Sequence, residues 1–276
     1  LSVGPAMAVL SDGGYVPTVY YTQGPGEATQ LVLAHAAEYD CVVCVGGDGT
    51  LSETVAGLAQ LPAPPPLGYI PQGTANDVAV SLKIPKNSVK AAKLITRGNV
   101  IRQDVGSFNE NDYFTYIAAF GAFTEVSYET PRESKQVLGH LAYVLQGVSH
   151  LPKITPCHTT VEFEGGVIKE DLIFGGVSNT KSVGGIVKLK KLGIELNDGL
   201  FEVTLVRNPT NVLEMNKIVS DVLTQNFSGG QVMMFQSKRV KFTFDKPVKW
   251  TRDGEAGGAH REVMLENLHA RIGILV

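Results

Sequence analysis

Residues 41–53 read Cys-Val-Val-Cys-Val-Gly-Gly-Asp-Gly-Thr-Leu-Ser-Glu, which is an apolar run, a glycine-rich turn and the start of a helix. The run Cys41–Val45 is apolar and largely β-branched, so it predicts a buried strand. Glycines after a strand let the backbone turn sharply and bring its N–H groups close to an anion. The helix predicted over Leu51–Leu61 would direct the positive end of its dipole to the same place. This stretch therefore predicts a phosphate-binding loop, with a plain strand-to-helix turn as the alternative.

Three polar side chains of this stretch have predicted roles. Thr50 and Glu53 have the spacing of a capping box, which would fix where the helix begins. Asp48 lies at the carboxyl end of a predicted parallel strand, where open α/β sheets bind ligands. Its carboxylate suits a magnesium ion that bridges to phosphates. If the turn is only structural, Asp48 is simply a solvated acid.

The cysteines predict packing rather than chemistry. Cys41 and Cys44 form a Cys-x-x-Cys pair, but residues three apart on a strand face opposite sides. With Cys157 the count is three, which does not make a disulfide framework and favours a reducing compartment. We expect Cys41 and Cys44 to lie in the core.

A second loop, Pro71-Gln-Gly-Thr-Ala-Asn-Asp77, follows the strand predicted over Leu67–Ile70. The Thr74 hydroxyl and the Asn76 amide could bond phosphate or ribose oxygens, although the same residues are ordinary loop chemistry. Two such loops at the ends of adjacent strands could clasp a nucleotide between them.

The pattern of the chain changes near residue 102. Before it, strands and helices alternate, which favours a parallel sheet. After it, period-two alternation favours antiparallel strands, with a hairpin turn at Gly165-Gly166. The elements predicted outside the two loops are strands over Tyr15–Tyr21, Thr160–Glu164, Leu172–Val177, Leu200–Val206 and Lys241–Phe244, and helices over Glu27–Glu38, Ser88–Thr96, Val137–His150 and Val212–Gln225.

Composition excludes several classes of protein. The chain has 276 residues, 43% of them hydrophobic and only 18% charged, which is not the composition of a disordered chain. Its formal net charge of −3, without Lys and Arg clusters, gives no reason to expect a nucleic-acid partner. No apolar run is long enough to span a bilayer, and nothing at the start resembles a signal peptide.

Two late motifs carry acids in tight turns. In Trp250-Thr-Arg-Asp-Gly-Glu255, a glycine between two carboxylates would present one of them as a general base, yet a hairpin turn with solvated acids is the favoured interpretation of the hexapeptide alone. For Asn197-Asp198-Gly199, likewise, the spacing alone favours an ordinary turn that enters the following strand.

Together these motifs resemble the diacylglycerol kinase catalytic-domain family, in its bacterial soluble lipid-kinase branch. The residues that carry the resemblance span the chain from about Thr22 to the end, and comprise Gly46-Gly-Asp-Gly-Thr50 with Glu53, Pro71-x-Gly73-Thr74-x-Asn76-Asp77, Asp198-Gly199-Leu200 and Asp253-Gly254-Glu255. Gly-Gly-Asp-Gly-Thr also occurs in nicotinamide-nucleotide kinases, so that motif alone does not identify the substrate. The family begins with a strand and an Asn-Pro-x-Ser-Gly loop, and no such segment precedes Leu1 here.

The resemblance implies an α/β plus β fold. An N-terminal α/β nucleotide-binding domain like that of NAD kinases and diacylglycerol kinases is expected over 1–101, without its first strand. A C-terminal β-sandwich-like lipid kinase domain is expected over 102–268, and 269–276 would return to the first domain as a strand. The active site would lie in the cleft between the domains.

The resemblance also assigns site residues. Asp48 would act with Mg²⁺, and Glu255 would be the base that takes the proton of the lipid hydroxyl. A second, structural magnesium would be held by the Asp198 carboxylate and by the carbonyls of Glu195 and Leu200. Asn197 is often a second Asp in relatives, which leaves one charge fewer here. The residues expected to contact ATP are Thr22, Gly46, Gly47, Asp48, Gly49, Thr50, Leu51, Ser52, Glu53, Gly73, Thr74, Asn76 and Asp77.

The function implied is an ATP- and Mg²⁺-dependent lipid kinase that phosphorylates a hydroxyl of diacylglycerol or a related lipid. It would be cytoplasmic and would meet its lipid substrate peripherally at the membrane surface, without a nucleic-acid partner; the prediction allows a homodimer. The alternatives are an NAD kinase-like nucleotide kinase and a non-catalytic nucleotide-binding regulatory protein.

Overall fold

The computed structural model describes residues 3–74, 76–110, 112–122, 155–179, 182–183, 187–188, 197–224 and 227–276. The chain divides into two compact units. Unit 1 comprises 1–105 and 268–276, and unit 2 comprises 106–267. The helix predicted over Val137–His150 lies outside the described residues, as does Glu195.

Unit 1 contains the predicted parallel sheet. Strand β1 (Val42–Gly46) pairs in parallel with β2 (Leu67–Pro71), and Leu67 of β2 pairs in parallel with Ile274 of β13 (Glu255–Leu275). The last residues of the chain therefore return to the first sheet. The helices of this unit are α1 (Gly4–Asp12), α2 (Glu27–His35), the 3₁₀ helix η1 (Ala36–Glu38), α3 (Asp48–Gln60), α4 (Asp77–Ser81) and α5 (Ser88–Arg97).

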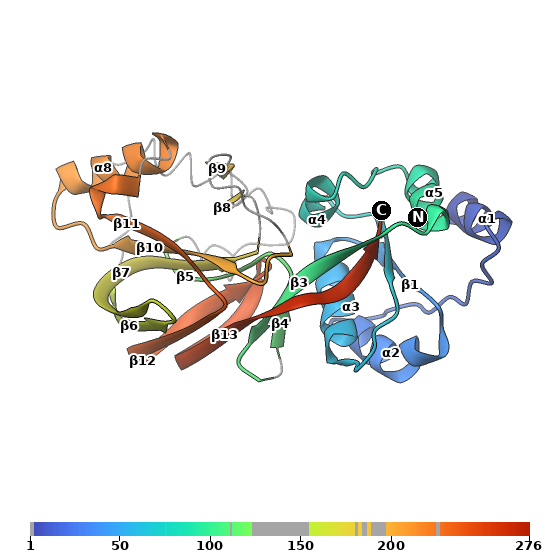
Figure 1. Ribbon diagram of the computed structural model, residues 1–276, viewed down its shortest axis with the longest axis horizontal. Coiled ribbons are helices and arrows are strands. Elements are labelled where there is room, and N and C mark those ends of the chain that lie inside the picture. Colours follow the sequence, from blue (N-terminus) through green and yellow to red (C-terminus); the bar gives the residue numbers. More distant parts are fainter. Residues whose placement is uncertain are drawn as a thin grey trace. The chain divides into compact units, whose positions relative to one another are not determined.

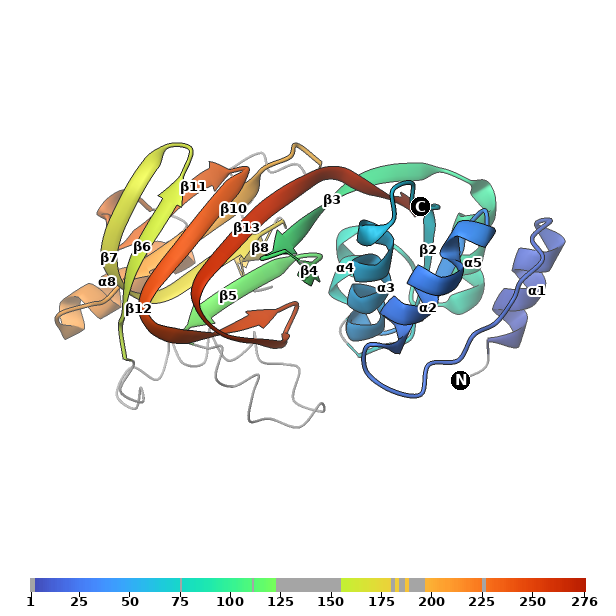
Figure 2. The same ribbon diagram turned by 90° about the horizontal axis from the view of Figure 1, so that it is seen from below.

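Helices cover both faces of this sheet (Figures 1 and 2). On one face Gly68 of β2 meets α5 so closely that an added Cβ would lie 2.7 Å from Ile95 Cδ1. On the other face α2 and α3 pack together at Gly57, where an added Cβ would lie 2.7 Å from Val32 Cβ. Leu58 of α3, like the C-terminal Ile274, is buried. The parallel sheet predicted from the alternating pattern is confirmed, and helices cover both of its faces.

The strand predicted over Tyr15–Tyr21 is wrong. Residues 15–23 follow α1 without regular secondary structure, and Val16 and Tyr21 are 91% and 81% exposed. None of the described strands pairs with this segment, and a strand needs a neighbour for its N–H and C=O groups. The sequence pattern also gave no sign of α1 or α4.

Unit 2 is built from antiparallel strands, as predicted. Both β5 (Ile117–Gly121) and β6 (Cys157–Phe163) pair with the two long strands β7 (Gly166–Ser178) and β12 (Arg239–Arg252), at different parts of their length. The remaining described elements that lie wholly or partly here are β3 (Val100–Phe108), β4 (Asp112–Phe114), β8 (Ser182–Val183), β9 (Val187–Lys188), β10 (Phe201–Arg207), α8 (Val212–Thr224), the 3₁₀ helix η4 (Phe227–Gly229), β11 (Val232–Ser237) and β13.

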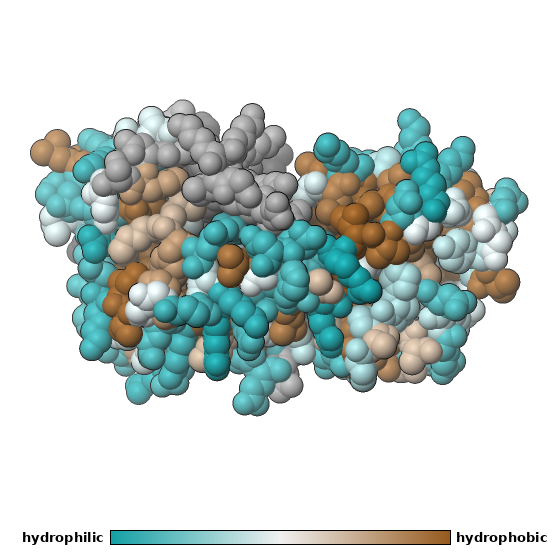
Figure 3. Space-filling model, viewed as in Figure 1, coloured by the Kyte–Doolittle hydropathy of each residue, from teal (hydrophilic) through white to brown (hydrophobic). Residues whose placement is uncertain are grey.

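Aromatic side chains fill the core of unit 2. The ring of Trp250 lies 4.9 Å from that of Phe120 and 5.3 Å from that of Phe242, and all three side chains are fully buried. Such contacts favour folding beyond the burial of area alone. The surface over β12 and β13 is mainly hydrophilic in Figure 3, as expected where alternate side chains face water.

Both cysteines of the Cys-x-x-Cys pair are free, and Cys44 is buried, so the expectation of core packing is confirmed for Cys44. Cys41 precedes β1 and is only partly buried. Burial raises the pKa of the Cys44 thiol to about 12 and that of the Cys41 thiol to about 11. The thiolate is the reactive form, so neither group is suited to redox chemistry.

We therefore predict that both thiols are inert in the folded protein. In a Cys157→Ser variant at pH 8, the native protein should react with the thiol reagent DTNB at least about 100-fold more slowly than the same protein in urea, because so little thiolate is present. Rapid reaction of both thiols without denaturant would contradict the burial described here.

Candidate active site

The two glycine loops of unit 1 lie side by side at the ends of β1 and β2. A Cβ added to Gly73 would lie 2.6 Å from Gly47 Cα, and one added to Gly47 would lie 3.2 Å from Gly73 Cα. The N–H of Gln72 donates to the carbonyl of Gly46 at 2.7 Å. The expected adjacency of the loops is confirmed, and only residues without a side chain allow this approach.

Asn76 holds the second loop together. Its Oδ1 accepts from the N–H of Gly73 at 2.9 Å, and its Nδ2 donates to the Gly73 carbonyl at 2.7 Å. The residue is 1% exposed and has a left-handed backbone, with φ 55°. The amide predicted to bond phosphate or ribose oxygens thus makes hydrogen bonds within its own loop, and positions Gly73.

The hydroxyl of Tyr69 lies between the two loops, within hydrogen-bond distance of both. Its hydroxyl lies 3.3 Å from the Gly46 carbonyl and 3.2 Å from Asn76 Oδ1, so its one proton can be donated to either loop. Burial, followed by the Asp48 charge, raises the pKa of Tyr69 above its ordinary value, so the phenol keeps this proton. Nothing in the sequence marks Tyr69, because the hydrogen-bond partners of a tyrosine in an apolar strand cannot be identified from sequence.

Asp48 is the first residue of α3, not a loop residue before it. Gly47 is the N-cap and offers no side chain to the free N–H groups of the first turn. Asp48 Oδ2 accepts from the N–H of Asn76 at 2.7 Å. Asp48 Oδ1 is buried and has no hydrogen-bond partner among the described residues. An unsatisfied carboxylate oxygen beside a helix N-terminus fits a divalent cation shared with phosphates.

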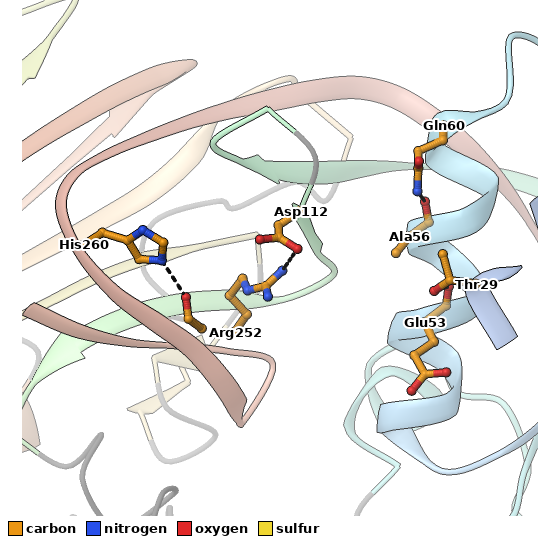
Figure 4. A network of polar contacts seen from close by, with 8 residues as sticks. Thr29, Glu53, Ala56, Gln60, Asp112, Arg252 and His260 are labelled. Atoms are coloured by element: carbon orange, nitrogen blue, oxygen red, sulfur yellow. Dashed lines mark hydrogen bonds and ion pairs between the residues drawn. The ribbon is translucent and has the colours of Figure 1, made fainter. Parts of the chain in front are cut away.

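The predicted capping box is wrong. Glu53 caps the neighbouring helix α2, since its Oε1 accepts from the N–H of Gly26 at 2.8 Å and its Oε2 from that of Ala28 at 3.2 Å. Its carbonyl accepts from the Thr29 hydroxyl at 2.8 Å, the contact drawn in Figure 4. A residue three positions after Thr50 can complete a capping box only when Thr50 is the N-cap. Here Gly47 is the N-cap of α3, so Glu53 is free of that constraint and bonds to α2 instead.

The other residues expected at the nucleotide differ in exposure. Thr22 and Thr74 are exposed, and Asp77 begins α4. Gly49, Thr50 and Ser52 follow Asp48 on α3. Leu51 is 1% exposed and its N–H donates to the Gly47 carbonyl, so both its side chain and its amide serve the fold.

In unit 2 the turn Asp253-Gly254 joins β12 to β13, and Glu255 is the first residue of β13. Glu255 is exposed, whereas Asp253 is 4% exposed. Asp253 Oδ2 accepts from the N–H and hydroxyl of Thr115 at 2.7 and 2.5 Å, and Oδ1 accepts from the N–H groups of Tyr116 and Ile117 at 3.0 and 3.1 Å. Burial raises the pKa of Asp253, against the opposing effect of these bonds. A hairpin with two solvated acids is thereby excluded.

Arg252 supports the same hairpin. Its Nη1 lies 2.8 Å from Asp112 Oδ1, as Figure 4 shows, and its guanidinium carbon lies 5.3 Å from the centre of the Phe108 ring. His260, also drawn there, bonds the Gly257 carbonyl at 2.9 Å. These contacts fix the strands on both sides of the turn.

The turn at Asp198 is described only from residue 197 onward. Asp198 Oδ1 accepts from the N–H of Leu200 at 3.0 Å, and Asp198 is exposed. Glu202 follows, 3% exposed, and burial, with a further effect of the Asp198 charge, raises its pKa to about 7. Among the described residues no group of three or more His, Cys, Asp or Glu side chains could hold a metal.

No helix in the described part of the chain is long and apolar enough to cross a membrane.

Two family models match most of the chain. Residues 4–108 match the family model "Diacylglycerol kinase catalytic domain", and residues 120–267 match "YegS C-terminal NAD kinase beta sandwich-like domain". Diacylglycerol kinase of Bacillus subtilis (strain 168) is 35% identical over 252 residues, which cover 90% of this chain and 82% of that protein. Diacylglycerol kinase of Staphylococcus aureus (strain JH9) is 33% identical over 255 residues, which cover 92% and 80%.

Solved structures show the same fold. A crystal structure of a protein from Bacillus anthracis str. Sterne matches with a TM-score of 0.80 at 25% identity. The match covers 99% of this chain and 87% of the chain in that structure. The structure of a diacylglycerol kinase from the same organism has a TM-score of 0.76 at 24% identity, and covers 99% and 88%.

The tie between the loops predicts a stability effect. Tyr69→Phe keeps the ring and removes only the hydroxyl, which leaves a buried acceptor with one donor fewer. We expect the free energy of unfolding to fall by about 1 kcal/mol in urea titrations. Tyr39→Phe is the matched control, because it removes an exposed hydrogen bond to Tyr20 and should cost clearly less. Equal stability of Tyr69→Phe and the wild type would show that the hydroxyl does not join the loops.

Proposed function

The chain belongs to the diacylglycerol kinase family, and we propose that it is a lipid kinase that transfers the γ-phosphoryl group of ATP to a hydroxyl of diacylglycerol or a related lipid. The observation that carries this proposal is the glycine contact between the two loops at the N-terminus of α3. The relatives that cover most of the chain are named diacylglycerol kinases, which supports a lipid kinase over a nicotinamide-nucleotide kinase that shares the first loop and the broad architecture.

Each residue has a role set by its surroundings. The N–H groups at the start of α3 would bind the ATP phosphates, together with the exposed Thr74 hydroxyl of the second loop. Asp48, through its unsatisfied Oδ1, would hold the Mg²⁺ of the nucleotide. When bound, Mg²⁺ offsets the negative charge that gathers on the phosphates during transfer. The Asp198 turn would hold a second, structural Mg²⁺, in which the carbonyls of Glu195 and Leu200 remain proposed ligands.

Glu255 would act as the general base. The lipid oxygen forms a bond to the γ-phosphorus as the bond from that phosphorus to the ADP oxygen breaks, and the hydroxyl proton passes to the Glu255 carboxylate. Exposure of Glu255 at the start of β13 leaves the carboxylate accessible to a substrate. Because the acceptor is a lipid, the reaction would take place at the surface of a bilayer or micelle.

Loss of either acid should slow transfer strongly without unfolding the protein. Glu255→Gln should lower kcat by at least about 100-fold, the range typical of a missing general base. Asp48→Asn keeps an acceptor for the Asn76 N–H and should lower kcat similarly. The assay uses labelled ATP with diacylglycerol in mixed micelles, beside a parallel reaction with NAD. Near-normal turnover by Glu255→Gln would refute the base, labelled NADP would favour the nucleotide kinase, and ATP binding without either product would favour the regulatory alternative.

The structural metal has its own test. Mg²⁺ should raise the Tm of the wild type, because a ligand that binds only the folded state stabilises it. We expect the rise in Tm to be smaller in Asp198→Asn than in the wild type. In the control Asp245→Asn, which changes an acid elsewhere on the same unit, the rise should equal that of the wild type. Identical responses of the wild type and Asp198→Asn would remove Asp198 from the metal site.

A further inference from the structure

The two acids of the Asp253-Gly254-Glu255 turn lie in opposite surroundings. Glu255 is exposed, whereas the Asp253 carboxylate is enclosed and accepts four hydrogen bonds. All four donors come from Thr115, Tyr116 and Ile117, which form the entry to β5. The Asp253 N–H returns a fifth bond to the Ile117 carbonyl at 2.8 Å. A solvated turn would need none of these contacts.

These bonds extend the β5–β12 pairing into the turn. The pairing joins Trp250 to Phe120 and ends with Arg252 opposite Ala118. Beyond this pairing, the Asp253 carboxylate accepts the hydrogen bonds, and the donors at 115–117 fix its position. The hairpin therefore cannot rotate about the end of β12 without breaking buried hydrogen bonds, each of which leaves an unsatisfied group.

The backbone conformation of the turn is unfavourable for Asp253 unless its side chain is held by hydrogen bonds. Asp253 has φ 48° and Gly254 has φ 80°, the two positive values that a two-residue hairpin turn of type I′ requires. The left-handed conformation costs a residue other than glycine about 1 kcal/mol. The enclosed carboxylate offsets this cost, and Arg252 and Glu255 then face each other across the turn as paired residues.

From these contacts we infer that Asp253 and Thr115 are positioning residues for Glu255, which hold the start of β13 in place so that the Glu255 carboxylate meets the acceptor hydroxyl. The inference rests on the proposed role of Glu255 as the base. Asp253 and Thr115 do not themselves touch the substrate; the Thr115 hydroxyl acts through Asp253, and Asp253 through the turn. Misplacement of a reacting group by about 1 Å can cost about 100-fold in rate.

The sharpest test changes the Thr115 hydroxyl alone. Thr115→Val is nearly isosteric and removes one of the four bonds, so we expect kcat to fall about 10-fold while the KM for ATP changes less than about twofold. Thr115→Ser restores the hydroxyl and should restore most of kcat. The matched control is Thr159→Val, which removes a bond from an equally buried threonine to the Cys157 carbonyl at 2.8 Å and should leave kcat unchanged.

Asp253→Asn is the stronger variant. Its amide NH₂ must face N–H donors on one side, so two bonds are lost and kcat should fall about 100-fold. Thermal melts are recorded for every variant. If Asp253→Asn does not fold, the comparison of Thr115→Val with Thr115→Ser still decides the matter.

A double-mutant cycle separates this inference from the proposed function. In a Glu255→Gln background, Thr115→Val should change the residual rate by less than about twofold, because the hydroxyl acts only through Glu255. If Glu255→Gln is inactive while folded Thr115→Val and Asp253→Asn keep the kcat of the wild type, the positioning role is refuted and the base stands. If Glu255→Gln keeps near-normal turnover, the base assignment fails first.

Discussion

The candidate nucleotide site depends on one close approach of two backbones. Gly47 and Gly73 lie so near that a side chain on Gly73 would meet the main chain of the other loop. Because of this contact, the turns that follow two adjacent parallel strands lie together, beside the start of α3. Tyr69 and Asn76 keep the glycines there, since their polar groups are buried and form hydrogen bonds with residues of the loops.

In both units, buried polar groups hold exposed ones in place. Asn76 and Tyr69 hold the loop at Gly73 as Asp253 and Thr115 hold the late turn, and in each case the holding group is almost inaccessible to water. Buried hydrogen bonds are costly to break, so they fix the positions of the groups that they join. Glu255, the base that we propose, is exposed beside the buried group that holds its turn.

Much of this arrangement could be predicted from sequence, because it depends on local patterns. The strand, glycine turn and helix of residues 41–60, and the antiparallel unit, follow from periodicity and from glycine. The partners of polar side chains could not be predicted, because they lie far away in the sequence. Glu53 caps a helix 25 residues away, and Asp253 binds a segment 138 residues earlier. The segment 15–21 alternates like a strand but lacks a described partner strand.

The glycine contact is tested most directly by calorimetric titration of ATP into Gly73→Ala. An added Cβ would lie 2.6 Å from Gly47 Cα, so the loops must separate and ATP affinity should fall at least about 10-fold while the far-UV spectrum is retained. Gly4→Ala, where an added Cβ meets nothing within 4 Å, should bind ATP as the wild type does. If Gly73→Ala binds ATP with the affinity of the wild type, the two loops do not form the phosphate site.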